Sequence, residues 1–387
     1  MTSKHKINKI VNVVSIIHNT QPGGVQRVAA LETDALNKNG YKSFLASILK
    51  TKEWSLFNEL NIEPIYLFNN EMVGRLLSGI FFNIGNLKKI EPDVVIAHNN
   101  PGFQVAHNLK RKLEKEGKKV FIISYIHDSL VYPIAGSVFG KFLHIFKGQF
   151  RKLEQRNILE SNIVLVNSNA TMNRLLEVHK NLEDIIKKKS TILYPTTNVP
   201  ITKDKLVVEK KNYLLIVGRI DHEAFYNLYK IIKNLDIPLV IAGYGHPYNP
   251  NFKKIRELFN SLRKEGKNIK FIFSPSDEEL LELYRNASLF VYPGHENFNM
   301  SAIEAMSAGC PILVANTSGV CEILPHKLRD ELTLDKKDIQ LWVDKIKEII
   351  ENDMSYELGY ECWKVTQKYN LYTHIEKFLK ILNEVIK

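Results

Sequence analysis

The sequence predicts two α/β domains in series, each built on a doubly wound parallel sheet. The first observation is the length, because 387 residues exceed what one hydrophobic core usually serves. The second is the composition, with 44% hydrophobic and 25% charged residues, which is typical of folded globular chains. The third is a series of continuous apolar runs, each followed by a helical pattern, as expected of parallel strands buried on both faces.

Ten runs rich in Val, Ile and Leu are the predicted strands. Five come before the middle of the chain and five after it, which indicates two sheets. They occupy residues 10–17, 42–49, 92–98, 119–127, 162–168, 212–219, 238–245, 268–274, 287–293 and 310–316.

The segment between the two sets of strands is irregular, contains two prolines and becomes charged, so we place the linker near residues 195–212. The predicted N-terminal Rossmann-like domain therefore spans residues 1–198 and the C-terminal one residues 199–365. Residues 366–387 have the apolar spacing of an amphipathic helix, which can pack back on the N-terminal domain.

The positive charge lies in the first half. Residues 1–200 contain 27 Lys and Arg against 16 Asp and Glu, whereas residues 201–387 contain 26 of each kind. A basic half favours an anionic partner, either a nucleic acid or an acidic membrane surface. Because the sequence contains no recognisable nucleic-acid-binding motif, we expect no nucleic acid partner, although a nucleic-acid binder is an alternative class.

Cysteine usage and hydropathy indicate the compartment. Three cysteines without CxxC spacing fit neither a disulfide framework nor a zinc site. No stretch approaches the roughly 20 apolar residues that cross a bilayer. We therefore expect a cytoplasmic protein. Residues 139–156 interleave aromatic and basic side chains, as an interfacial helix at the inner membrane face would, or as a core helix with a basic side would; residues 72–90 have the same ambiguity.

Two glutamates flank a predicted helix start in the segment PGHENFNMSAIEAMSAGCP. Ser301 and Glu304 match a capping box, which would explain Glu304 by backbone hydrogen bonding alone. It does not explain Glu296. Free N–H groups at a helix start suit phosphates, and carboxylates accept paired hydrogen bonds from vicinal hydroxyls. The combination indicates a site for a nucleotide sugar.

Residues 284–324 resemble the donor-binding motif of family 4 glycosyltransferases, also called glycosyl transferases group 1. The pattern is a pair of glutamates with seven residues between them, followed by EAM-x-x-G-x-P, and both parts are present. HNTQPGG, IEPDVVIAHN, YIHD, LLIVGR and LVIAGYG follow the order of that family. The resemblance implies the GT-B fold, in which two Rossmann-like domains face each other across a cleft, and sugar transfer with retained configuration and no metal.

By this resemblance three side chains carry the transfer. Glu296 would lie near the transferred sugar, and His127, in YIHD, would face that sugar from the N-terminal domain. Arg219, at a predicted strand end, would hold the diphosphate, because its planar guanidinium matches phosphate oxygens. Apart from the resemblance, Arg219 can be an exposed strand-end arginine and His127 a histidine bonded within its own loop.

The resemblance also implies which residues bind the donor. Glu304 would bind the ribose hydroxyls. The other donor-binding positions lie in predicted turns and glycine segments: Gly218, Asn297, Phe298, Asn299, Met300, Gly243, Gly245, Gly23 and Gly24. Plain tight turns are the alternative for the glycines. His18, His98 and Asp128 lie at similar strand ends as neighbours of the same site.

The sequence departs from the family at two places. Ala224 stands where most members carry a lysine, and Lys230 or Lys233 would have to substitute for that cation. Asn297 and Asn299 stand where glycines are common; asparagine tolerates left-handed backbone and caps helices, so the turn can persist.

The predicted function is that of a retaining glycosyltransferase that needs no cofactor. It would move a hexose-like sugar from a nucleoside-diphosphate sugar to an anionic lipid-linked or glycan acceptor, in the synthesis of a cell-surface polysaccharide or glycoconjugate. The missing lysine leaves one alternative within the fold, a catalytically silent protein that binds sugar nucleotides.

Overall fold

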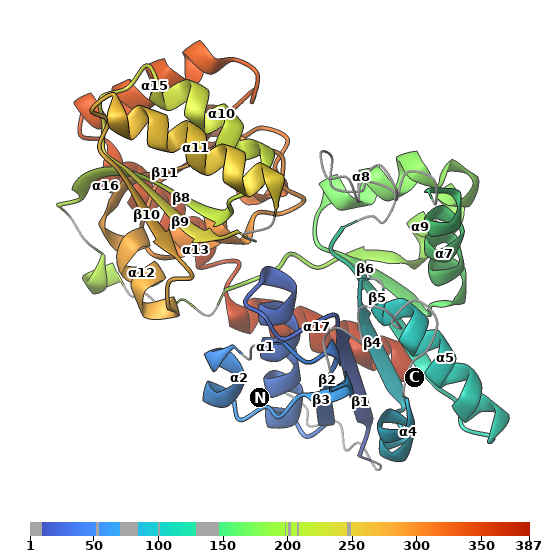
Figure 1. The fold of residues 1–387 in the computed structure, drawn as a ribbon. Helices are drawn as coiled ribbons and strands as arrows, with labels where there is room; N and C mark the ends of the chain where they lie inside the picture. The colour runs from blue at the N-terminus through green and yellow to red at the C-terminus, as the bar shows by residue number, and fades with distance from the viewer. Residues whose placement is uncertain are drawn as a thin grey trace. The chain divides into compact units, whose positions relative to one another are not determined.

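The computed structural model describes residues 10–51, 54–69, 84–99, 101–128, 147–197, 199, 203–206, 209–245 and 249–387. These residues form two compact units. The first unit contains the described residues of 1–132, 147–194 and 372–387, and the second those of 195–371. The end of the chain thus returns to the first unit (Figure 1). Residues 139–146 of the predicted basic aromatic helix 139–156, and residues 72–83, lie outside the described residues.

The first unit is built on a seven-stranded sheet with the order β3-β2-β1-β4-β5-β6-β7, in which all strand pairs are parallel. Its strands are rich in β-branched residues and are buried on both faces. They are β1 (Asn12–Ile17), β2 (Lys42–Leu49), β3 (Ile65–Phe68), β4 (Val94–His98), β5 (Phe121–Ile126), β6 (Ile163–Val166) and β7 (Ser190–Ile192).

Two apolar clusters cover the faces of this sheet. On one face, α1 (Gly24–Lys38) and the C-terminal helix α17 (Leu371–Ile386) pack against the central strands, with Phe378 and Leu382 of α17 fully buried. Burying each of these two side chains contributes roughly 1.5–3 kcal/mol. Helices α5 (Gly102–Lys115) and α7 (Lys147–Glu160) are among those on the other face. The remaining helices of the unit are α2 (Ser55–Glu59), α4 (Gly85–Ile90), α8 (Asn169–Val178), η1 (Lys180–Leu182) and α9 (Glu183–Lys189).

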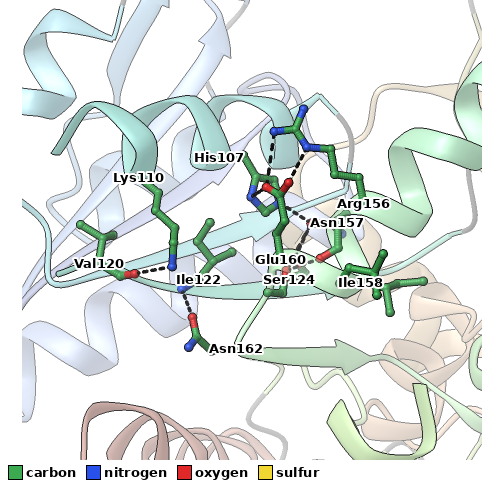
Figure 2. Close-up of polar contacts among 12 residues, drawn as sticks. His107, Lys110, Val120, Ile122, Ser124, Arg156, Asn157, Ile158, Glu160 and Asn162 are labelled. Carbon is green, nitrogen blue, oxygen red and sulfur yellow. Dashed lines mark hydrogen bonds and ion pairs between the residues drawn. The ribbon is translucent and has the colours of Figure 1, made fainter. Parts of the chain in front are cut away.

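A buried polar network joins α5 and α7 to β5 (Figure 2). The Asn157 Oδ1 atom accepts a hydrogen bond from the Ser124 hydroxyl at 2.6 Å and lies 3.1 Å from His107 Nε2. His107 Nδ1 lies 3.0 Å from Glu160, which also accepts a hydrogen bond from Arg156 Nε at 2.6 Å. Because buried polar groups are costly unless paired, this network fixes how the two helices seat on the strand.

The second unit is built on a six-stranded sheet with the order β10-β9-β8-β11-β12-β13, again with parallel pairs. In Figure 1, α10, α11 and α15 lie on one side of it and α12, α13 and α16 on the other. The strands are β8 (Lys211–Arg219), β9 (Leu239–Tyr244), β10 (Ile269–Phe273), β11 (Ala287–Tyr292), β12 (Ile312–Ala315) and β13 (Thr333–Leu334). The helices are η2 (Lys203–Lys205), α10 (Glu223–Ile232), α11 (Pro250–Lys264), α12 (Asp277–Asn286), α13 (Met300–Ser307), η3 (Gly319–Ile323), α14 (His326–Leu332), α15 (Ile339–Glu351) and α16 (Ser355–Thr366).

The predicted fold class is confirmed: each unit is a Rossmann-like parallel sheet covered by helices. Each of the ten predicted strands is present. Three further strands, β3, β7 and β13, were not predicted, and each lies at an edge of its sheet.

Candidate active site

The loops that follow β8 and β11 form the candidate site of the second unit. In a parallel sheet all carboxyl ends lie at one edge, where α/β proteins bind their ligands. Strand β8 ends at Arg219, and β11 ends at Tyr292, four residues before Glu296. The two strands are paired in the sheet, so the folding of this one unit brings two of the predicted side chains to the same edge.

Glu296 is held by a tyrosine that sequence reasoning missed. The Tyr292 hydroxyl donates a hydrogen bond of 2.6 Å to Glu296 Oε1. Tyr292 is 2% exposed, and burial, followed by the negative charge of Glu296, raises the pKa of its hydroxyl well above the usual value, so that it remains a donor. The Glu296 backbone carbonyl accepts from Gly319 N–H at 2.9 Å. The Glu296 carboxylate is thus oriented, yet 37% of its side chain is exposed to a ligand.

His222 is the second residue that sequence reasoning missed. It precedes α10 as its N-cap, and its Nδ1 atom accepts a hydrogen bond from Ala224 N–H at 3.3 Å. The same ring lies 3.2 Å from the Tyr292 hydroxyl and, through Nε2, 3.8 Å from Glu296 Oε1. The sequence feature that could have identified His222 is its position between Arg219 and Ala224, the residue that stands in place of the expected lysine.

Arg219 is oriented by a carboxylate. Its Nε donates to Asp221 Oδ1 at 3.0 Å, and Asp221 Oδ2 accepts from Asn249 Nδ2 at 2.6 Å. Burial opposes the guanidinium charge, but nearby negative groups, chiefly Asp221 and then also Glu296, raise the pKa of Arg219 overall. The side chain is 40% exposed, so the cation remains accessible to an anionic ligand.

Glu304 lies in α13, and the predicted capping box around it is wrong. The helix begins at Met300, and its N-cap is Asn299, whose Oδ1 accepts from Ala302 N–H at 3.1 Å. Asn299 has a φ of 72°, a left-handed conformation that asparagine tolerates. Glu304 therefore does not cap the helix. Its Oε2 accepts a hydrogen bond from the buried Tyr284 hydroxyl at 3.0 Å.

The position of the missing lysine is closed. Ala224 is fully buried, and a Cβ atom added to Gly294 would lie 2.7 Å from the Ala224 Cβ, so the loop that carries Glu296 is seated directly on this alanine. The predicted substitutes do not reach the site. Lys230 and Lys233 are exposed near the end of α10, where Lys233 lies over the Tyr229 ring. At about 1.5 Å per residue they lie roughly 10 Å or more from its N-terminus.

The other predicted donor-binding residues of the second unit are either glycines in close packing contacts or residues that follow Glu296 in its loop. Gly243 is required by strand packing, because its φ is 138° and a Cβ atom there would lie 2.0 Å from the Gly218 carbonyl oxygen. Gly245 similarly packs against the Phe252 ring. Phe298 is buried, whereas Asn297 and Met300 are half-buried beside Glu296.

The first unit holds the remaining predicted residues. His127 follows β5 and is buried, with Nε2 3.1 Å from His98 Nδ1. Gly23 is the N-cap of α1 with an extended φ of −178°, which any residue can adopt, and Gly24 is the first residue of that helix. Of the other two expected neighbours, His18 is exposed, and Asp128, which follows His127 in the chain, is exposed and lies 3.5 Å from Arg174.

Comparison with known proteins gives a family match within the second unit. The family model described as Glycosyl transferases group 1 matches residues 199–361, a range that contains Arg219, Glu296 and Glu304. Residues 199–361, less than half of the chain, thus resemble the group 1 glycosyltransferases. The expected family resemblance is therefore confirmed.

Relatives within this group include enzymes named for different sugars. The chain is 25% identical to human alpha-1,3/1,6-mannosyltransferase ALG2 over 56% of each chain. It is 27% identical to 2-deoxystreptamine N-acetyl-D-glucosaminyltransferase of Niallia circulans over 62% of each. The matches thus span less than two thirds of the length of these relatives.

The GT-B fold is confirmed by solved structures. Anabaena Alr3699/HepE in complex with UDP and glucose has a TM-score of 0.75 to this chain, at 13% identity, covering 97% of this chain and 100% of that chain. Within the described residues, no helix has both the length and the apolar character needed to cross a membrane.

Proposed function

We propose that this protein is a group 1 glycosyltransferase, a retaining enzyme that transfers a hexose-like sugar from a nucleoside-diphosphate sugar. The observation that carries the proposal is the Tyr292–Glu296 hydrogen bond at the same sheet edge as Arg219. It holds an exposed carboxylate near an accessible cation, as a sugar joined to a diphosphate requires. Relatives named for mannose and N-acetylglucosamine transfer, and the UDP and glucose complex of the neighbour, support a hexose-like donor.

In the proposed reaction the bond between the anomeric carbon and the diphosphate oxygen breaks, and the acceptor hydroxyl attacks the same face. The acceptor proton passes to a phosphate oxygen of the leaving diphosphate. Arg219 would stabilise the charge that develops on that diphosphate, and Glu296 would hold sugar hydroxyls. Glu304 would accept hydrogen bonds from the ribose. This scheme uses no metal ion and no cofactor.

The acceptor and the location follow from charge. The excess of Lys and Arg in residues 1–200 favours an anionic acceptor, such as a lipid-linked sugar diphosphate at the inner face of the cell membrane or an anionic glycan. The product would then contribute to a cell-surface polysaccharide or glycoconjugate. In this proposal the protein is cytoplasmic and peripheral to the membrane.

The test is a thermal-shift panel of UDP-, GDP- and ADP-sugars, followed by transfer and donor-hydrolysis assays with each sugar that raises Tm. A donor present at 100 times its Kd stabilises the folded protein by about 2.7 kcal/mol. Glu304→Ala should lose the shift, and Glu296→Gln should keep the shift but lose turnover. If no sugar nucleotide raises Tm in the wild-type protein, the proposal is refuted.

A catalytically silent sugar-nucleotide-binding protein is the second candidate, and the burial of Ala224 favours it. The usual lysine would place a cation beside the diphosphate, and this chain has closed that position. The wild-type protein would then bind a nucleotide sugar in the shift panel but neither hydrolyse it nor transfer its sugar to any acceptor tested. That result would establish this alternative.

A further inference from the structure

A basic groove lies between helix α11 and the edge strand β10 of the second unit, and is here called the edge groove. Its volume is about 520 Å³, and its lining comes only from α11, β10 and the turn that joins them. None of the lining residues is acidic, and none belongs to the candidate active site. They are Arg256, Asn260, Arg263, Asn268, Ile269, Lys270, Phe271 and Phe273.

The positive charge at this groove is a local feature of the second half of the chain. Residues 250–273 contain seven Lys and Arg against two Glu, whereas the rest of residues 201–387 contains 19 Lys and Arg against 24 Asp and Glu. Arg256, Arg263 and Lys270 are exposed, and among the described residues no carboxylate forms an ion pair with any of them. Their charges therefore remain available to an anionic ligand.

Helix α11 directs two arginines to the groove. Arg256, Asn260 and Arg263 are spaced i, i+4 and i+7, so they lie along one side of the helix. The guanidinium carbon of Arg256 lies 5.6 Å from the ring centroids of both Phe252 and Phe273, which holds this cation beside the edge strand. The helix thus forms a charged wall of the groove.

Strand β10 forms an aromatic wall. Phe271 packs edge-on against Phe259 of α11, with ring centroids 6.2 Å apart, and Phe273 stacks on Phe271 at 5.7 Å. Phe273 is nevertheless 47% exposed. Lys270 lies between the positions that alternate toward α11, so its side chain points to the other face of the sheet. A strand added beside β10 would therefore meet positive charge on both of its faces.

The backbone of β10 leaves a row of hydrogen-bonding groups open. This strand ends the sheet order and pairs only with β9. Ser274 N–H donates to the Gly243 carbonyl of β9 at 2.8 Å, and alternate residues of a parallel strand bond to the same neighbour. The N–H and C=O groups of Ile269, Phe271 and Phe273 consequently point away from β9. Within the described residues these groups have no hydrogen-bond partner.

An extended polypeptide matches both features of the groove. The open N–H and C=O groups require acceptors and donors at the spacing of a strand, and a peptide that adds to a sheet edge supplies both, as the ligands of PDZ and PTB domains do. A polymer of phosphates or sulfates supplies acceptors alone. A second copy of this chain is disfavoured, because pairing of two such edges would bring like charges together.

We propose that the edge groove is a docking site for an extended acidic segment of a partner protein. The segment adds as a strand to β10 and directs Asp or Glu side chains at Arg256 and Arg263. From Ile269 to Phe273 the strand extends roughly 13 Å, at about 3.3 Å per residue, so about five residues of the partner fill the site. This inference does not depend on the proposed sugar transfer.

Protection of the edge against aggregation is the competing explanation. Edge strands commonly carry lysine, which discourages pairing with other chains. That explanation accounts for Lys270. It does not account for two arginines on a neighbouring helix or for the exposed ring of Phe273.

The first experiment selects peptides on the full chain from a display library of ten-residue peptides, with Asp or Glu fixed at alternate positions. The best peptide is then titrated by fluorescence anisotropy. Arg256→Glu/Arg263→Glu should weaken its binding by roughly tenfold or more, as should replacing its acidic residues with Gln. Lys254→Glu/Lys264→Glu is the matched control, because it makes the same change of net charge on exposed residues of α11 that do not line the groove. It should change Kd by less than about twofold.

The second experiment distinguishes strand addition from simple charge attraction. Only every second amide of an added strand faces β10. N-methylation of one alternate set of peptide amides should therefore abolish binding, whereas N-methylation of the other set should leave it nearly unchanged. Equal effects of the two sets would overturn the proposal. A library that yields no peptide dependent on Arg256 and Arg263 would overturn it as well.

Two competing ligands complete the test: a ten-nucleotide uridylate RNA and vesicles of phosphatidylglycerol. Binding of either one that Arg256→Glu/Arg263→Glu removes, without peptide binding, would assign the groove to a nucleic acid or to a membrane instead. Circular dichroism and Tm establish that the variants fold, and Arg256→Gln/Arg263→Gln replaces the double reversal if that variant does not. If the wild type binds no sugar nucleotide, the proposed function fails, and the peptide titrations still decide this inference.

Discussion

Replacing Tyr292 with phenylalanine tests whether the orientation of Glu296 governs turnover. The substitution removes one hydroxyl from a residue that is 2% exposed and leaves the ring packed in place. It deletes the 2.6 Å donation to Glu296 Oε1, while the backbone hydrogen bond from Gly319 to the Glu296 carbonyl remains. The loop should therefore keep its position, and the carboxylate should lose its fixed direction.

The expected size of the effect follows from the type of hydrogen bond. A hydrogen bond to a charged group contributes about 1.5–3 kcal/mol. The raised pKa of Tyr292 keeps its hydroxyl protonated, so the full contact is present across the working pH range. At about 1.4 kcal/mol per factor of ten, kcat should fall roughly 10- to 150-fold in Tyr292→Phe if the orientation matters in the transition state.

Tyr284→Phe is the matched variant, because Tyr284 is 1% exposed and its hydroxyl donates to Glu304 at 3.0 Å. If Glu304 binds the ribose, this change should weaken donor binding by up to the same about 1.5–3 kcal/mol, roughly tenfold or more, and leave kcat nearly unchanged. Steady-state kinetics and isothermal titration with the donor measure both quantities. An unchanged kcat in Tyr292→Phe, or the same change of KM in both variants, would refute the division of roles between the two glutamates.

Three further predictions concern stability. Ala224→Lys should lower Tm and restore no activity, because the new ammonium would be buried against Gly294 at a cost of several kcal/mol; a rise in kcat would contradict this. Asn157→Leu should lower the free energy of unfolding by about 1–3 kcal/mol, seen as a lower urea midpoint with an unchanged m-value, since it removes an acceptor shared by the buried Ser124 hydroxyl and His107 Nε2; an unchanged midpoint would contradict it. Burial lowers the pKa of His98 in the folded state to about 3, so below pH 6.5 the unfolded chain binds more protons than the folded chain. The contribution of His98 to the free energy of unfolding should therefore fall by about 1.4 kcal/mol for each unit by which the pH is lowered. Stability in His98→Gln should decline less steeply between pH 6.5 and 4 than in the wild type, and parallel curves would show that this histidine does not contribute.

The interior strands could be predicted from the sequence, whereas most short edge strands could not. Strands such as β1 and β8 are covered on both faces over residues 13–17 and 214–217, where most positions are apolar, so the run stands out. The strands that were missed, β3, β7 and β13, have two to four residues, and each pairs on one side only. Such segments need too few apolar residues to form a recognisable pattern.

The candidate site was predictable where the family pattern is local. Glu296 and Glu304 lie within a single loop and helix, so their spacing is readable in the sequence. Their partners give no such signal: Tyr284 lies on α12, and Tyr292, although only four residues before Glu296, ends β11 and has the pattern of an ordinary buried aromatic residue. The capping box was wrong because serine and asparagine both cap helices well, and only the backbone shows that Asn299 has this role.

The closed position at Ala224 connects the departure from the family to the geometry of Glu296. The loop that carries this glutamate is fastened to α10 by Asn227, whose amide donates to the Pro293 carbonyl at 2.7 Å, and by the contact of Gly294 with Ala224. A longer side chain at position 224 would displace that loop from α10. The loop of Glu296 is therefore firmly seated, and the His222 imidazole lies beside it, with Nε2 3.8 Å from Glu296 Oε1. In the proposed transfer we expect Arg219 and His222 to share the stabilisation of the leaving diphosphate, so removing either side chain should lower kcat more than donor affinity.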